Sequence, residues 1–152
     1  LTHMQMEKEG IWIENELPDN LPRVMVRSQE IQQVFINILS NSRYALNKKF
    51  PEQHMEKAVF IRGGQIRDKQ GDMVRMEFLD KGPGIPQSEL SKICDPFYST
   101  KPKGKGTGLG LSISYKIIQD HQGRMFFDSK EGEYTRVFLE LPVYKDKENV
   151  NA

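Results

Sequence analysis

The chain has 152 residues, of which 28% are charged, and a formal net charge of +1. This length fits one domain with a hydrophobic core, and the balanced charge argues against a nucleic-acid-binding module. No apolar run approaches the length of a membrane span. The single cysteine, Cys94, cannot form an internal disulfide. We therefore expect a reducing, cytoplasmic compartment, which leaves open whether a parent protein is anchored in a membrane.

The first part of the chain predicts two short strands and a long helix. Residues 1–9 are interpreted as a cloning remnant or the remainder of an upstream linker, outside the folded domain. Residues 10–17 are typical of a strand ended by the turn PDNLP, and RVMV (23–26) of a second strand. Ser28 can cap a helix. Apolar residues at helical spacing then predict an amphipathic helix to about residue 47.

The second part predicts paired strands separated by helices. Strands are expected at 58–64 and 72–80, joined by a hairpin, and again at 124–129 and 135–142. Helices are expected at 87–95 and 109–123, the latter with Gly123 as its C-cap, and residues 144–152 form a charged, flexible tail. This order predicts an α+β fold over 10–143, a two-layer sandwich whose mixed, largely antiparallel sheet packs against three helices.

Polar side chains form a stripe along the long helix. Asn37, Asn41, Tyr44 and Lys48 share one flank of the apolar face. Asparagine oxygens suit Mg²⁺, and asparagine amides can donate hydrogen bonds to phosphate. A solvated helix flank is the alternative interpretation.

An aspartate ends the strand at 72–80 on its core-facing side. Alternation places Val74, Met76, Phe78 and Asp80 on one face, and a buried carboxylate needs a hydrogen-bond donor. Because Gly82 and Gly84 carry no side chains, a flat ring could approach the backbone here, and an adenine amino group would be a suitable donor. The alternative is a turn in which the aspartate bonds its own backbone.

A lysine- and glycine-rich loop precedes the last helix. Lys101, Lys103 and Lys105 could close over phosphates, or form an ordinary solvated run. The glycines that follow could expose backbone amides to an anion at the start of the helix, or permit close helix packing. They are Gly106, Gly108 and Gly110.

Taken together, these segments resemble the catalytic ATP-binding domain of sensor histidine kinases, in the superfamily that includes DNA gyrase, Hsp90 chaperones and MutL repair proteins. The resemblance covers about residues 10–143. QQVFINILSNSRYAL resembles the N box, DKGPGI the first glycine box, DPFYSTK the F box and GKGTGLGLS the second glycine box. The endings PFYSTK and NSRYAL are most similar to the nitrogen-regulation branch. The resemblance implies the Bergerat fold.

The resemblance also implies a role for each matching residue, with ATP and Mg²⁺ as cofactors. Asn41 would coordinate Mg²⁺, Asn37 would lie one turn earlier, and Asp80 would accept the adenine amino group. Lys101 would approach the phosphates and, with Asn37 and Asn41, makes up the implied catalytic set. The other implied nucleotide-binding residues are Tyr44, Gly82, Gly84, Ile85, Phe97, Lys105, Gly106, Thr107, Gly108, Leu109, Gly110, Leu111 and Thr135.

The implied reaction is transfer of the ATP γ-phosphate to a histidine on a separate dimerisation domain, and from there to a response regulator. None of His3, His54 and His121 has the surroundings of an acceptor, so we expect this chain to bind ATP without phosphorylating itself. The full-length protein would be a homodimer and this domain a monomer, with no nucleic-acid partner.

Three other functions stay open. The first is a hydrolytic ATPase of the same superfamily, which would need a glutamate where Asn37 stands. The second is a serine kinase of the anti-sigma type, which would need its own base near the N box. The third is a non-catalytic nucleotide-sensing or scaffolding domain.

Overall fold

The fold is a five-stranded mixed sheet with helices, seen in a computed structural model that describes residues 2–95, 98 and 109–146. The strand order is β1-β2-β3-β5-β4, in which β1 pairs with β2 in parallel and all other pairs are antiparallel. The helices are α1 (Thr2–Lys8), α2 (Ser28–Lys49), α3 (Gln87–Leu90) and α4 (Gly110–Asp120). The strands are β1 (Trp12–Asn15), β2 (Ala58–Asp68), β3 (Gly71–Asp80), β4 (Arg124–Lys130) and β5 (Tyr134–Pro142). The predicted α+β sandwich is confirmed.

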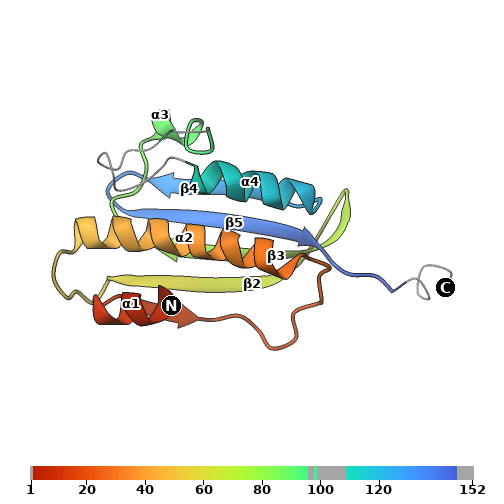
Figure 1. Ribbon diagram of the computed structural model, residues 1–152, viewed down its shortest axis with the longest axis horizontal. Coiled ribbons are helices and arrows are strands. Elements are labelled where there is room, and N and C mark those ends of the chain that lie inside the picture. Colours follow the sequence, from red (N-terminus) through yellow and green to blue (C-terminus); the bar gives the residue numbers. More distant parts are fainter. Residues whose placement is uncertain (1, 96–97, 99–108, 147–152) are drawn as a thin grey trace.

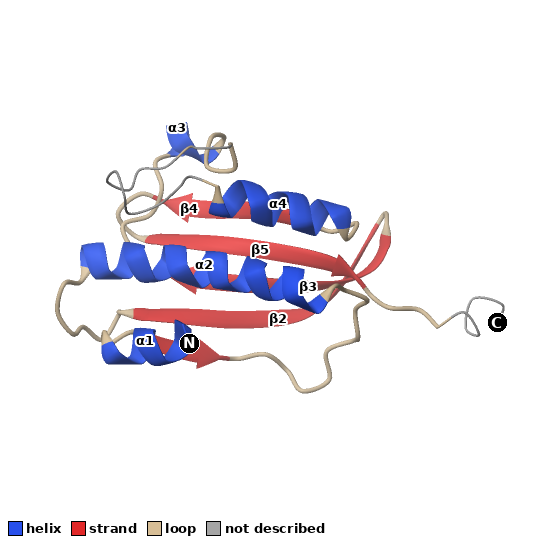
Figure 2. Ribbon diagram, in the orientation of Figure 1, coloured by secondary structure: helices blue, strands red, loops and turns tan. Residues whose placement is uncertain are grey.

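Helices α2 and α4 lie side by side along one face of the sheet (Figures 1 and 2). The main core fills the space between the two layers. Ile38 of α2 and Ile118 of α4 are almost fully buried against Phe78 and Leu139 of the central strands. The core-facing row expected along β3 is present, since Val74, Phe78 and Asp80 are buried and Met76 is partly buried against the core. The alternation is incomplete, because Met73 on the other face is buried too. The sandwich therefore places the end of β3 beside the middle of α2.

The N-terminal residues are part of the packed structure, and the sequence pattern missed this. Helix α1 buries Met6 completely in a second core cluster with Ile11, Leu46 and Val59. Just after α1, Glu9 accepts a hydrogen bond from Asn47 Nδ2 at 3.0 Å and pairs with Arg43. The Arg43 guanidinium lowers the pKa of Glu9 to about 2. Residues 2–9 therefore pack against the domain whose start the sequence pattern placed at residue 10.

The side-chain hydrogen bond at the start of α2 comes from a different residue than the predicted Ser28. Ser28 is the first helical residue rather than the cap, and Arg27 at the N-cap position has no side-chain capping bond. Instead, the backbone N–H of Arg27 donates to Nε2 of His121 at 3.0 Å, while Nδ1 of His121 lies 2.7 Å from the carbonyl oxygen of Ile117. Through these two ring nitrogens His121 joins the end of α4 to the start of α2.

The end of α4 also differs from the prediction. Gln122, with φ of 57°, takes the left-handed conformation expected of a C-terminal glycine. Gly123 follows it, and its N–H donates to the carbonyl oxygen of Ile118 at 2.9 Å. A Cβ on Gly123 would lie 2.3 Å from the carbonyl oxygen of Glu140. The glycine is therefore needed for close approach to β5 rather than for backbone conformation.

Several predicted segments have different extents in the structure. The strand expected at 10–17 covers Trp12–Asn15, and the helix expected at 87–95 covers Gln87–Leu90. RVMV forms a single bridge, Val24 with Val143, rather than a strand. The hairpin of β2 and β3 is longer than predicted, with pairing as far as Asp68 and Gly71.

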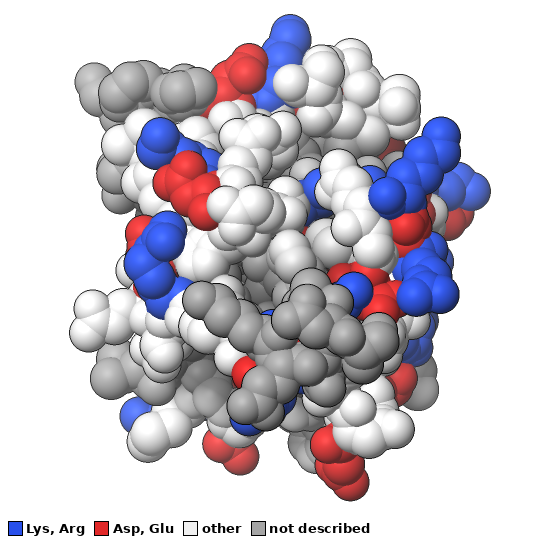
Figure 3. Space-filling view, turned by 90° about the vertical axis from the view of Figure 1, so that its right-hand side faces the viewer, with Lys and Arg blue, Asp and Glu red and all other residues white. Residues whose placement is uncertain are grey.

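At the end of the molecule where this hairpin turns, Lys and Arg side chains lie next to Asp and Glu side chains (Figure 3). One such ion pair joins Arg67 Nε to Asp72 Oδ1 at 3.0 Å.

No helix in the described part of the chain is long and apolar enough to cross a membrane.

Candidate functional site

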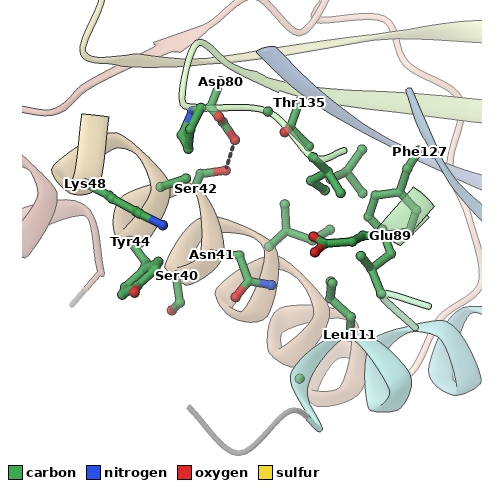
Figure 4. Close-up of a pocket in the computed structure, with 18 of the residues that line it drawn as sticks. Ser40, Asn41, Ser42, Tyr44, Lys48, Asp80, Glu89, Leu111, Phe127 and Thr135 are labelled. Carbon is green, nitrogen blue, oxygen red and sulfur yellow. Dashed lines mark hydrogen bonds between the residues drawn. The ribbon is translucent and has the colours of Figure 1, made fainter. Parts of the chain in front are cut away.

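A cleft of about 590 Å³ opens between α2, the start of α4 and the ends of β3 and β5 (Figure 4). It brings together predicted site residues from four separate stretches of the sequence. Those that line it are Asn37, Asn41, Tyr44, Asp80, Gly84, Ile85, Gly110, Leu111 and Thr135, together with Lys48 of the polar stripe. The cleft is therefore the candidate site.

Asp80 lies at the buried end of the cleft, called the closed end below. Its side chain accepts hydrogen bonds from Ser42 Oγ on Oδ2, at 3.0 Å, and from the backbone N–H of Gly82 on Oδ1, at 2.9 Å. Only 4% of the residue is exposed. Burial raises the pKa of Asp80 to about 6, and these two bonds and the charge of Lys49 oppose the rise. A buried carboxylate with remaining acceptor capacity is suited to a polar donor on a flat, apolar ring.

The loop after β3 interlocks with the turn between β4 and β5. Gly132 N–H donates to the carbonyl oxygen of Pro83 at 2.6 Å, and Ile85 N–H donates to Ser129 Oγ at 2.8 Å. Gly84 has a φ of 69°, and a Cβ there would lie 2.2 Å from the carbonyl oxygen of Lys130. The loop is thus held against the turn by contacts that only glycine permits at position 84.

The other two predicted residues near this end are Gly82 and Thr135. A Cβ on Gly82 would come within 2.8 Å of Asp80 Oδ1 and 3.0 Å of the Ala45 side chain. Thr135 lies directly opposite Asp80 in the pairing of β3 with β5, and its hydroxyl is 3.1 Å from Ser129 Oγ. The strand register therefore places Thr135 beside Asp80.

The polar stripe of α2 forms one wall of the cleft. Figure 4 shows Asn41 and Lys48 projecting from α2 beside the open space, with Tyr44 nearby, and the carboxylate of Glu89 reaching in from α3 on the opposite side. The wall thus offers an amide, a phenol and an ammonium group within one cleft. This arrangement can bind a ligand that is apolar at one end and anionic at the other.

Asn37 lines the cleft and also joins the two helices. Its Nδ2 donates to the carbonyl oxygen of Gly110 and to Ser114 Oγ, both at 3.0 Å. Its Oδ1 accepts a hydrogen bond from Gln33 Nε2 at 2.8 Å. Both ends of the amide are therefore engaged by the protein, and the side chain holds the start of α4 against α2.

The residues present fit a magnesium ion held jointly with a ligand. Across residues 2–95, 98 and 109–146, no group of three or more His, Cys, Asp or Glu side chains could hold a metal ion. Mg²⁺ in nucleotide sites typically keeps several waters and takes one or two protein oxygens plus phosphate oxygens. The amide oxygen of Asn41 and the carboxylate of Glu89, which face the same space in Figure 4, are suitable oxygen donors.

Several predicted site residues lie outside the described part of the chain. They are Phe97, Lys101, Lys105, Gly106, Thr107 and Gly108. Leu109 is described and stands at the N-cap position of α4, directly before Gly110.

Some lining residues were missed by the sequence reasoning. Glu89, Tyr98, Phe127 and Glu131 line the cleft, and Ser42 both lines it and bonds Asp80. Phe127 had a usable signal, because alternation from buried Met125 places it on the core-facing side of β4. Ser42 had none, since its bond to Asp80 joins residues 38 positions apart.

Comparison with known proteins identifies the family. Residues 26–145 match the family described as histidine kinase-, DNA gyrase B-, and HSP90-like ATPase. The chain is 33% identical over 148 residues to sporulation kinase E of Bacillus subtilis, covering 97% of this chain and 18% of that kinase. It is 34% identical over 146 residues to the sensor protein kinase WalK of Staphylococcus haemolyticus, covering 92% of this chain and 22% of WalK.

Solved structures agree with this assignment. The catalytic domain of histidine kinase ThkA has a TM-score of 0.73 and 29% identity, covering 93% of this chain and 84% of that one. The fold also matches full-length ShkA in complex with AMPPNP, with a TM-score of 0.76 and 21% identity, covering 95% of this chain and 29% of that one. The chain therefore belongs to the histidine kinase-, DNA gyrase B-, and HSP90-like ATPase family, as an ATP-binding catalytic domain of the sensor histidine kinase type.

Proposed function

We propose that the cleft binds Mg·ATP with the adenine ring at Asp80 and the phosphates toward the start of α4. The observation that carries this proposal is the buried carboxylate of Asp80, 4% exposed, at the closed end of the cleft. Ser42 and Gly82 donate to the Asp80 carboxylate, whose oxygens can accept further hydrogen bonds. Because the carboxylate is buried, leaving that acceptor capacity unused costs free energy. The exocyclic amino group of adenine supplies a donor there, whereas guanine presents a carbonyl oxygen at the corresponding position.

The other site roles follow from the family resemblance and are part of the same proposal. Asn41 coordinates Mg²⁺ through its amide oxygen, and Thr135 supports the adenine end. Gly110 and the glycines before it offer backbone amides to the phosphates. Lys101 and Lys105 neutralise phosphate charge, and Phe97 anchors the segment that carries them. When bound, Mg²⁺ would neutralise charge between the phosphates.

The proposed reaction is transfer of the γ-phosphate of ATP to a ring nitrogen of a histidine, with release of ADP. The enzyme's task in such a transfer is positioning and charge stabilisation. Asn37 supports transfer over hydrolysis, because its amide donates to Gly110 and Ser114 and cannot act as a general base toward water.

The acceptor histidine is proposed to lie on a separate dimerisation domain. His121 has both ring nitrogens within the protein's own contacts, and His54 stacks on Phe50 with its Nδ1 accepting from the Glu56 N–H. His121 is therefore not presented for transfer. The parent protein would be a homodimer that passes the phosphate to a response regulator in the cytoplasm, while this domain alone would be a monomer.

We further propose that the parent protein belongs to the nitrogen-regulation branch. The segments PFYSTK and NSRYAL support this assignment. The relatives named above are not named as nitrogen-regulation kinases, so a separate experiment tests the branch. We expect the phosphorylated acceptor domain of the parent to transfer phosphate faster to a nitrogen-regulation receiver domain than to receivers from other systems.

The first experiment is a calorimetric titration with ADP and with GDP, each with and without Mg²⁺. We expect saturable ADP binding that strengthens with Mg²⁺, and GDP binding at least about tenfold weaker. Radiolabelled ATP, added together with the acceptor domain, then tests phosphotransfer directly. ADP binding without transfer would favour the nucleotide-sensing alternative, and phosphate release without an acceptor would favour the ATPase.

A further inference from the structure

Lys49 makes two contacts that the nucleotide-binding role does not account for. It is the last residue of α2, and its Nζ donates to the carbonyl oxygen of Gly82 at 3.2 Å and to that of Gly132 at 3.0 Å. These carbonyls belong to two different loops, the one after β3 and the turn between β4 and β5. One side chain therefore connects α2 to both loops at the closed end of the cleft.

The same glycine links Lys49 to Asp80. The carbonyl oxygen of Gly82 accepts from Lys49, and the N–H of Gly82 donates to Asp80 Oδ1 at 2.9 Å. Gly132 in turn donates its N–H to Pro83 at 2.6 Å. Fixing the two carbonyls thus fixes the loop that sets where the Asp80 carboxylate points.

The positive charge of Lys49 also acts on Asp80. Two other lysines next to these loops form ion pairs, Lys81 Nζ with Glu56 Oε1 at 3.5 Å and Lys130 Nζ with Glu133 Oε1 at 3.2 Å. The Lys49 ammonium instead lies on two neutral carbonyls, and its field favours the ionised form of Asp80. A flexible, neutral side chain of similar length would supply neither the hydrogen bonds nor the charge.

We propose that Lys49 is a positioning residue for adenine recognition, which holds the loop after β3 and the β4–β5 turn together so that Asp80 meets the base. The inference rests on the proposed function, since it concerns the same cleft. Lys49 is not among the residues that line the cleft, and it acts through Gly82 and Gly132.

The test compares Lys49→Met and Lys49→Arg with the unaltered chain by titration with ADP and with IDP, whose base lacks the amino group. Lys49→Met is expected to weaken ADP binding about tenfold and to leave IDP binding within about twofold, because the loss lies in reading the amino group. Lys49→Arg keeps the charge and donors and should recover part of the ADP affinity. Lys69→Met, an exposed lysine in the distant β2–β3 turn, is the matched control.

A second measurement needs no nucleotide. In the free domain, Lys49→Met should accelerate amide hydrogen exchange at Gly82 and raise the pKa of Asp80, followed by NMR of its carboxyl carbon. Unchanged exchange and titration would overturn the role of Lys49 whatever the nucleotides do. Equal losses for ADP and IDP would reduce Lys49 to a structural residue and overturn it too. If the unaltered chain binds neither nucleotide, the proposed function fails, and positioning for adenine fails with it.

Discussion

The two ends of the cleft are built in different ways. At the closed end, a buried carboxylate is surrounded by an interlocked loop and turn, with backbone contacts that allow no side chain at Gly84. At the other end, the Asn37 amide holds the start of α4 against α2, because its Nδ2 donates to the carbonyl oxygen of Gly110 and to the hydroxyl of Ser114. The closed end is therefore suited to reading a base with little rearrangement, whereas at the other end side-chain hydrogen bonds position the start of α4.

The largest effect should come from breaking the interlock at the closed end. Gly84→Ala places a Cβ 2.2 Å from the carbonyl oxygen of Lys130 at a φ of 69°. We expect the free energy of unfolding in urea to fall by about 3–4 kcal/mol, because the backbone must move on both sides. Gly64→Ala is the matched control, since nothing lies within 4 Å of its added Cβ. Equal stability of the two variants would contradict the interlock.

The buried charge should make stability depend on pH. The pKa of Asp80 is raised from 3.8 to about 6, so the folded state holds its proton over a range in which the unfolded chain has lost it. This contribution is fully present below pH 3.8 and is lost as pH rises through about 6. The loss is up to about 3 kcal/mol, at 1.36 kcal/mol for each pKa unit. Urea unfolding between pH 4 and pH 7 should show the decline, and Asp80→Asn should remove it.

Adenine recognition should depend on the Asp80 carboxylate itself. Ser42 and Gly82 donate to different oxygens of Asp80, so the N–H₂ of Asp80→Asn must face one of these two donors. The substitution also removes the charge-assisted bond to the base. We expect ADP binding to weaken about 10- to 100-fold by calorimetry, which corresponds to a charge-assisted hydrogen bond. Asp19→Asn, at an exposed loop position, should bind ADP like the unaltered chain. Retained affinity in Asp80→Asn would place the base elsewhere.

The smallest effect is expected at the helix junction. Asn37→Ala removes both bonds from α2 to the start of α4, at 3.0 Å each. We expect the free energy of unfolding to fall by about 1–2 kcal/mol, the usual net value of partly buried hydrogen bonds. Gln33→Ala removes only the exposed bond to Asn37 Oδ1 and should cost less than about 0.5 kcal/mol. A loss in Asn37→Ala as large as that in Gly84→Ala would remove the contrast between the two ends.

Much of the sheet and part of the site could be predicted from local pattern. Alternation along β3 identified Asp80 as the end of a core-facing row, and helical spacing placed Asn37, Asn41 and Tyr44 on one flank of α2. These properties repeat within a few residues, so they can be read from the sequence. The helix at residues 2–8 was not predicted, because its buried residue Met6 packs in the second core cluster against residues far away in the chain.

The sequence by itself determined the alternating and helical periods, the glycines of the loop after β3, and the type of residue available for each role. Only the tertiary structure decided which groups satisfy one another. Ser42 bonds Asp80 across 38 positions, Lys49 reaches two loops 33 and 83 positions away, and His121 satisfies Arg27 across 94 positions. Such contacts leave no periodic signal, because buried polar groups are satisfied by whichever donor the packing brings near.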